Sequence, residues 1–133
     1  MTNPRRSVHQ ALDHLSADLE QLARRMHGAP ELAYQEHQAA GWLCDFLAAQ
    51  GFAVERGVGG LPTAFRASLG RGGGPTVALL CEYDALPNIG HACGHNLIAA
   101  AGAGAGAALA AARDHLPAGR VLVIGTPAEE GGG

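Results

Sequence analysis

The sequence has 133 residues, 47% of them hydrophobic, and a formal net charge of −3. Such a composition excludes a disordered charged tail, and the slightly negative charge gives no footprint for nucleic acid. No apolar run is long enough to span a bilayer, and three unevenly spaced cysteines indicate no disulfide framework. We expect one domain, or part of one, in a reducing cytoplasmic setting without nucleic-acid or membrane partners.

The first half of the chain predicts two helices and two strands. Apolar residues at steps of three and four over residues 8–26 indicate an amphipathic helix, which the following Gly-Ala-Pro sequence should end. Pro30 is expected to open a second helix that continues to Gly51. Residues 52–55 predict a short strand, and residues 63–69 predict a strand that is half exposed or at an edge.

The second half predicts a strand–helix–strand unit, and with it the α/β class. Residues 77–81 are continuously apolar, as in a strand buried on both faces of a parallel sheet. Residues 97–113 form an Ala-rich helical pattern with Asn96 as the candidate N-cap, and residues 121–124 form a second buried strand. Three glycines within the helix should allow close packing on the sheet: Gly102, Gly104 and Gly106.

The side chains that could bind a metal ion or act in catalysis follow these two strands. Parallel strands end at the same edge of a sheet, and open α/β folds bind their ligands there. Imidazole, thiolate and carboxylate groups together suit zinc or a neighbouring divalent ion. The residues expected to converge at this edge are Glu82, Asp84, His91, Cys93, His95, Glu129 and Glu130.

The residues alone leave several interpretations of this cluster open. In a metal-dependent hydrolase, adjacent Glu129 and Glu130 could divide two tasks, one binding metal and the other acting as the base. Cys93 flanked by two histidines could instead be a thiolate nucleophile. A non-catalytic metal-binding or substrate-binding module is the alternative from a different class, and surface turns are the plainest interpretation of each motif taken alone.

Two motifs add a resemblance to a known family. EYDALPNIGHACGHN at residues 82–96 and GTPAEEGGG at residues 125–133 closely resemble the aminoacylase/carboxypeptidase-G family of metal-dependent peptidases and amidohydrolases, peptidase family M20. The similarity extends to residues 27–32 with Glu36. Within the family the chain looks most like the amidohydrolase branch that includes auxin-conjugate, aminobenzoyl-glutamate and β-alanyl-dipeptide hydrolases. That branch often has aspartate at the positions of Glu82 and Asn96, and these changes look like the aminobenzoyl-glutamate and dipeptide side of the branch.

The resemblance implies a three-layer α/β/α catalytic domain that holds two divalent metal ions (Zn, Mn or Co). Residues 1–133 would be its N-terminal part, and the remainder and a lid or dimerisation domain would lie beyond them. The implied substrate is an N-acyl-amino acid or a dipeptide-like amide, and the full-length protein would be a homodimer. The implied roles are metal binding by Cys93, His95 and Glu130, general-base catalysis by Glu129, and orientation of the site by Asp84.

Overall fold

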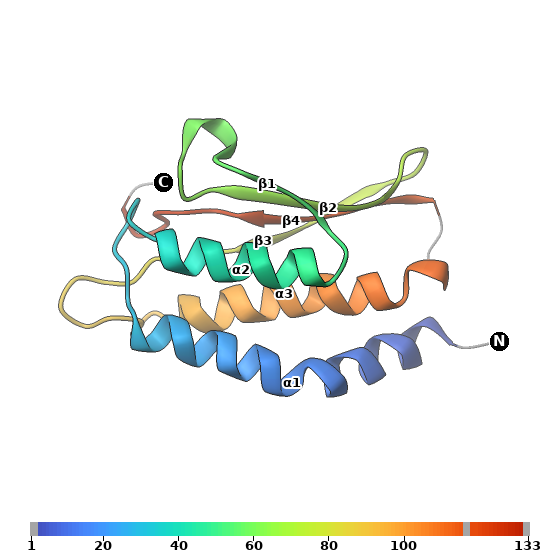
Figure 1. Ribbon diagram of the computed structural model, residues 1–133, viewed down its shortest axis with the longest axis horizontal. Helices are drawn as coiled ribbons and strands as arrows, with labels where there is room; N and C mark the ends of the chain where they lie inside the picture. Colours follow the sequence, from blue (N-terminus) through green and yellow to red (C-terminus); the bar gives the residue numbers. More distant parts are fainter. Residues whose placement is uncertain (1–2, 116–117, 132–133) are drawn as a thin grey trace.

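The computed structural model describes residues 3–115 and 118–131 as a mixed α/β structure (Figure 1). Its α-helices are α1 (Pro4–Gly28), α2 (His37–Ala49) and α3 (His95–Ala111). Its strands are β1 (Ala53–Arg56), β2 (Phe65–Arg71), β3 (Thr76–Cys81) and β4 (Gly119–Gly125). Two short 3-10 helices complete the described elements: η1 (Val58–Gly60) and η2 (Arg113–His115). No helix in these ranges has the length and apolar character needed to cross a membrane.

The four strands form one sheet in the order β1-β2-β4-β3. The pairs β1–β2 and β2–β4 are antiparallel, whereas β3 and β4 run parallel, with Cys81 opposite Gly125 at their carboxyl ends. The parallel pair predicted around α3 is therefore confirmed. The prediction that β3 is buried on both faces is wrong, because β3 lies at the sheet edge within the described residues and Val77 and Leu80 are 53% and 55% exposed. The strand β2 is half exposed, as predicted, but interior.

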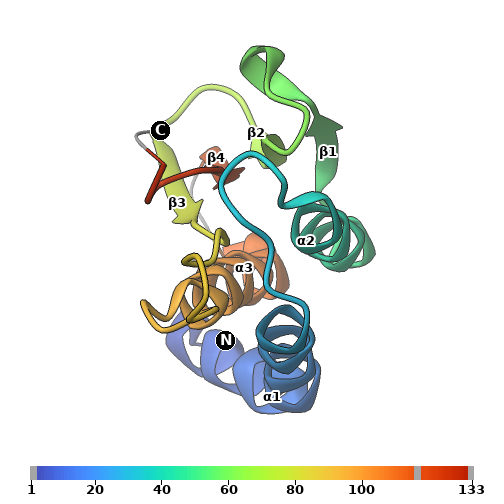
Figure 2. The same cartoon turned by 90° about the vertical axis from the view of Figure 1, so that its left-hand side faces the viewer.

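All three helices lie on the same side of this sheet (Figure 2). Helices α2 and α3 pack against the strands, and α1 packs outside them, mainly on α3. A side chain at Gly102 would collide with Cys81, and one at Gly106 would collide with Val123, so these glycines do permit close approach to the sheet. Gly104 instead faces Leu19 of α1, where a Cβ atom would also collide. The glycines of α3 thus serve both of its packing faces.

The second helix begins at His37 rather than at the predicted Pro30. Tyr34 has a left-handed backbone with φ of +65°, which is incompatible with a continuing helix. The carboxylate of Glu31 accepts the backbone N–H groups of the second and third residues of α2, both at 2.9 Å. Glu31 therefore caps the helix from outside instead of lying within its first turn.

The start of α3 also differs from the prediction. The helix begins at His95 with Gly94 as the N-cap residue, so the assignment of Asn96 as the N-cap is wrong. The Asn96 side chain is buried and donates to the backbone carbonyl of Ala23 in α1 at 3.1 Å. The Asn96 side chain therefore binds a carbonyl of α1 instead of a backbone N–H in the first turn of α3. His95 occupies the first turn of α3, where its ring lies beside Glu82 after β3 and Glu129 after β4.

Candidate metal centre

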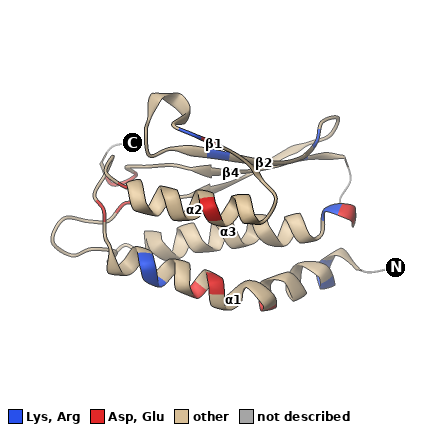
Figure 3. Ribbon diagram, in the orientation of Figure 1, with Lys and Arg blue, Asp and Glu red and all other residues tan. Residues whose placement is uncertain are grey.

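The loops that follow β3 and β4 leave the sheet from the same point. Thr126, the first residue after β4, donates from both its backbone N–H and its hydroxyl to the carbonyl of Cys81, at 2.9 and 3.1 Å. This pair of hydrogen bonds fixes the two loops beside each other. The predicted convergence of segments far apart in sequence therefore occurs, at the carboxyl edge of the parallel pair. Figure 3 shows acidic positions gathered at this end of the sheet.

His95 lies at the centre of the site, and its side chain is only 5% exposed. The ring atom Nδ1 lies 2.9 Å from the backbone oxygen of Asp84 and 3.0 Å from its carboxylate oxygen Oδ1. Both partners are acceptors, so Nδ1 carries the proton and donates to them. The atom Nε2 is then left with a free lone pair directed into the site.

Three carboxylates surround that lone pair. The distances from His95 Nε2 to the nearest oxygens of Glu82, Glu129 and Glu130 are 3.4, 3.6 and 3.8 Å. Within the described part of the chain, none of the three forms an ion pair with an arginine. Carboxylates this close together repel one another unless a proton or a cation lies between them. The arrangement is therefore one that a metal cation would stabilise.

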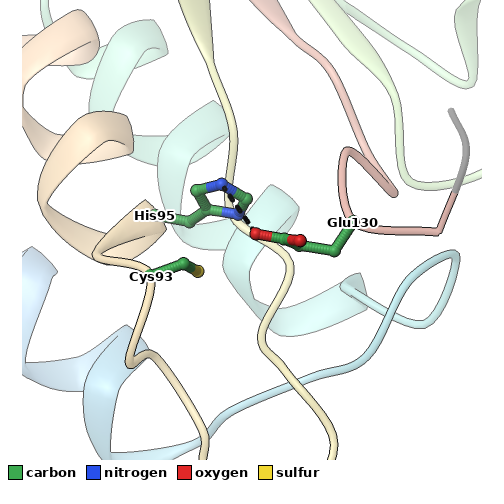
Figure 4. Close-up of side chains that lie close together, drawn as sticks. All are labelled: Cys93, His95 and Glu130. Carbon is green, nitrogen blue, oxygen red and sulfur yellow. Dashed lines mark ion pairs between the residues drawn. The ribbon is translucent and has the colours of Figure 1, made fainter.

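The candidate ligand atoms form two overlapping groups. In one, the ligand atoms of Cys93, His95 and Glu130 all lie within 4.8 Å of one another (Figure 4), and in the other those of Glu82, His95 and Glu129 do. Metal–ligand bonds of about 2.0–2.3 Å place neighbouring ligand atoms roughly 3.5 Å apart in a tetrahedral site. Small side-chain movements would therefore bring either group onto a cation, and a thiolate, an imidazole and a carboxylate are donors that suit zinc.

Asp84 connects the two sides of the site. Its carboxylate is fully buried, and while Oδ1 accepts from His95, the other oxygen Oδ2 accepts the backbone N–H of Glu130 at 2.9 Å. A carboxylate that orients an imidazole ligand is a common arrangement in metal sites, where it fixes the tautomer and the ring orientation. The Asp84 carboxylate thus contacts both His95 and the loop that carries Glu130, and its orienting role stays a prediction.

His91, which the sequence placed in the cluster without a role, belongs to neither group of ligand atoms. Its side chain is buried, and burial lowers the pKa of its imidazole, with further lowering by the neighbouring His27 and His95. Its Nδ1 has no hydrogen-bond partner, alone among the buried side-chain nitrogen and oxygen atoms of the described residues. The sequence also predicted that Glu82 lies at this edge, without a role for it, and the structure places its carboxylate beside His95.

Comparison with known proteins agrees with this geometry. Residues 78–133 match the profile of "Peptidase family M20/M25/M40". The chain is 46% identical over 141 aligned residues to Xaa-Arg dipeptidase of Mus musculus, covering 97% of this chain and 33% of that protein. It is 36% identical to one of the subunits of p-aminobenzoyl-glutamate hydrolase from Escherichia coli (strain K12), covering 90% of this chain and 29% of that protein. The chain belongs to this M20 peptidase family.

Solved structures show the same fold. A putative aminohydrolase from methicillin-resistant Staphylococcus aureus superimposes with a TM-score of 0.82 at 28% identity, covering 94% of this chain and 35% of that one. A Bacillus subtilis protein described as a dinuclear metal-binding M20 peptidase gives a TM-score of 0.79 at 30% identity, covering 89% of this chain and 36% of that one. The chain spans about a third of the length of the relatives it matches.

Proposed function

We propose that residues 1–133 form the N-terminal part of the catalytic domain of a metal-dependent hydrolase. The proposed reaction is hydrolysis of the amide bond of a dipeptide or an N-acyl-amino acid. The observation that carries this proposal is the Nε2 atom of His95, which faces three carboxylates while Asp84 holds Nδ1. The names of the relatives, a dipeptidase and an aminobenzoyl-glutamate hydrolase, support the substrate class.

The residues present fit a divalent cation such as Zn, Mn or Co. Cys93, His95 and Glu130 would hold it, because their ligand atoms lie within 4.8 Å of one another and combine thiolate, imidazole and carboxylate. A bound divalent cation would lower the pKa of a water molecule and polarise the amide carbonyl. One imidazole nitrogen binds one cation, so a second cation requires further donors, and the full-length protein is proposed to supply them beyond Gly133.

Glu129 is proposed as the general base. Its side chain is 50% exposed, so water and substrate can reach it, and its carboxylate lies 3.6 Å from His95 Nε2 without a shorter ion pair in the described residues. In this role the carboxylate takes a proton from the attacking water and delivers it to the nitrogen of the leaving amine. Asp84 holds the His95 ring in place throughout, and its second oxygen retains the backbone N–H of Glu130.

The test is removal and return of metal in the full-length protein. Treatment with a chelator should abolish hydrolysis of dipeptides and N-acyl-amino acids, and Zn²⁺, Mn²⁺ or Co²⁺ should restore it. Full activity in metal-free protein, verified by elemental analysis, would contradict the proposal. The 133-residue chain by itself is expected to show little or no hydrolysis, because its ligand set is incomplete.

The same geometry offers a thiol hydrolase as the second candidate, since Cys93 lies near an imidazole that an aspartate orients. This alternative gives no role to the three carboxylates around His95, and for that reason we rank it second. An alkylating agent added to chelator-treated protein separates the two: activity that survives chelation and is lost on alkylation would favour the thiol mechanism.

We further propose that the full-length protein is a cytoplasmic homodimer, which native mass measurement and fractionation can test.

A further inference from the structure

Glu36 is a buried acidic residue outside the proposed ligand set. Its side chain is fully buried, and within the described residues no arginine or histidine forms an ion pair with it. Burying a carboxylate without a counter-charge is costly unless hydrogen-bond donors replace the lost water. The fold surrounds Glu36 with such donors, and these donors come from segments that are distant in the sequence.

The three donors come from three different segments. The oxygen Oε1 accepts the backbone N–H of Tyr34 at 3.0 Å and that of Ala128 at 2.8 Å. The oxygen Oε2 accepts the hydroxyl of Thr63 at 2.9 Å. Glu36 therefore joins the turn before α2, the segment before β2 and the loop after β4, and Ala128 lies 92 residues further along the chain.

The bond to Ala128 is the one that bears on the site. Ala128 has a left-handed backbone with φ of +61°, a conformation that alanine adopts rarely. Glu129 and Glu130 follow it directly, so the backbone direction at Ala128 determines where both carboxylates point. The hydrogen bond to Glu36 stabilises this unfavourable conformation, as does a turn bond from the Gly131 N–H to the Ala128 carbonyl at 3.1 Å.

The same carboxylate is linked to the opposite side of the site. Thr63, which donates its hydroxyl to Glu36, accepts the hydroxyl of Tyr83 on its backbone carbonyl. Tyr83 is fully buried and stands between Glu82 and Asp84 in the loop after β3. Glu36 is thus hydrogen-bonded to one site loop directly and to the other through one residue.

From this geometry we propose that Glu36 is a positioning residue for the metal centre, which holds the loop of residues 126–130 so that Glu129 and Glu130 face His95. The inference rests on the proposed metal site and adds a residue that contacts neither metal nor substrate. Its test compares Glu36 with Glu31, since both carboxylates accept two backbone N–H groups. Glu31 accepts them from α2, however, and makes no side-chain bond to the loop after β4 among those described.

The experiment uses the full-length protein, with Zn²⁺ titrated against a chromogenic chelator and hydrogen exchange measured without metal. Glu36→Leu should weaken Zn²⁺ binding by about 10- to 100-fold, the range for groups that orient metal ligands. It should also speed amide exchange in residues 126–131. Glu31→Leu should lower the thermal unfolding temperature but leave Zn²⁺ affinity within about twofold, because the lost side-chain bonds go to α2, while the Glu31 carbonyl that accepts the Ala85 N–H is unchanged by the substitution.

Glu36→Gln is the conservative variant. The amide oxygen of the glutamine can still accept both N–H groups, and its amide nitrogen can donate to the hydroxyl oxygen of Thr63. The Zn²⁺ affinity should therefore stay within about threefold of the wild type. If Glu36→Leu does not fold, Glu36→Asp replaces it: the shorter side chain cannot reach Thr63 and Ala128 together and should weaken Zn²⁺ binding about 10-fold.

Two results would overturn the inference. One is unchanged Zn²⁺ affinity in the folded Glu36→Leu or Glu36→Asp protein. The other is an equal loss of affinity in Glu31→Leu, which would indicate general destabilisation. Hydrolysis is measured separately, so a wild-type protein that binds Zn²⁺ but cleaves no dipeptide or N-acyl-amino acid would contradict the proposed function and leave the comparison of Glu36 with Glu31 intact.

Discussion

The two sides of the candidate metal centre are built differently. On one side His95 is buried in the first turn of α3, and Asp84 accepts its ring N–H with two oxygens. On the other side the Glu129 and Glu130 side chains are 50% and 35% exposed, and the loop that carries them is fixed through backbone N–H groups. Hydrogen bonds hold the His95 ring itself, whereas on the other side they hold the backbone of the loop and leave the glutamate side chains free to move.

This difference has a physical consequence for binding. A ligand whose ring is already locked by packing and hydrogen bonds loses little conformational entropy when a cation binds. The exposed carboxylates must give up side-chain freedom at that moment, at a cost of up to about 2 kcal/mol for each glutamate. We therefore expect the histidine side to dominate metal affinity and the glutamate side to supply adjustable chemistry. Four predictions test that contrast in the full-length protein.

The largest effect is expected from removing the locked ligand. His95→Ala should weaken Zn²⁺ binding by more than about 100-fold, exceeding the range for outer-shell groups, and should abolish hydrolysis. Chelator competition and a dipeptidase assay measure the two effects. His9→Ala, at an exposed position on α1, is the matched control and should change neither. Retention of metal by His95→Ala would show that the central ligand has been misidentified.

Next in size is the loss of the proposed base. Glu129→Gln should lower kcat by about 10²- to 10⁴-fold, the usual contribution of general acid–base catalysis, and leave metal content unchanged. Its neighbour provides the comparison, because Glu130→Gln should lose metal as well as activity. Elemental analysis beside kinetics distinguishes the two variants. Metal loss in Glu129→Gln with retention in Glu130→Gln would reverse the two assignments.

A smaller effect should follow when the link between the two sides is weakened. Asn in place of Asp84 offers one side-chain acceptor where the aspartate offers two, so either the Glu130 N–H loses its partner or the His95 N–H keeps only the backbone oxygen of residue 84. Asp84→Asn should therefore reduce metal affinity about 10- to 100-fold without removing a ligand. Asp45→Asn, which removes an exposed partner of Arg56, is the control. Equal affinities in wild type and Asp84→Asn would exclude an orienting role for this carboxylate.

The smallest effect concerns Cys93, the proposed thiolate ligand beside His95. Burial raises the pKa of the Cys81 thiol to about 12 and also raises that of Cys44, so at pH 8 both stay protonated and shielded, whereas Cys93 is partly exposed. Iodoacetamide should therefore modify Cys93 in preference to the other two, as peptide mapping would show. Bound Zn²⁺ should slow that modification about 10-fold or more, since a metal-bound thiolate is a poorer nucleophile. Alkylation of Cys93 at the same rate with and without Zn²⁺ would remove it from the ligand set.

Much of this arrangement was predictable from the sequence. The apolar runs around an Ala-rich helix predicted a parallel pair of strands, and the order of Asp84, His95 and Glu130 after those strands predicted their convergence. These inferences held because the carboxyl ends of adjacent parallel strands meet whatever the rest of the fold does. The two sequence motifs also pointed to the peptidase family to which the chain belongs.

The predictions failed where a distant partner outweighed a local preference. Pro30 favours a helix start, yet the Glu31 carboxylate caps α2 from outside and Tyr34 turns left-handed. Asn96 is a good local N-cap, yet its amide is used on the carbonyl of Ala23. The apolar run of β3 looked interior, but its place in the sheet depends on strand order, which no local pattern encodes.

By itself, the sequence determined which side chains stand at the ends of which strands, because hydrophobic periodicity and turn residues act over short distances. The tertiary structure alone decided that Glu36 binds the N–H of Ala128, and that Asn96 binds the carbonyl of Ala23. Both depend on hydrogen bonds or close contacts between segments that folding brings together. Such contacts matter most for buried groups, because a carboxylate removed from water is costly unless hydrogen-bond donors from other segments surround it.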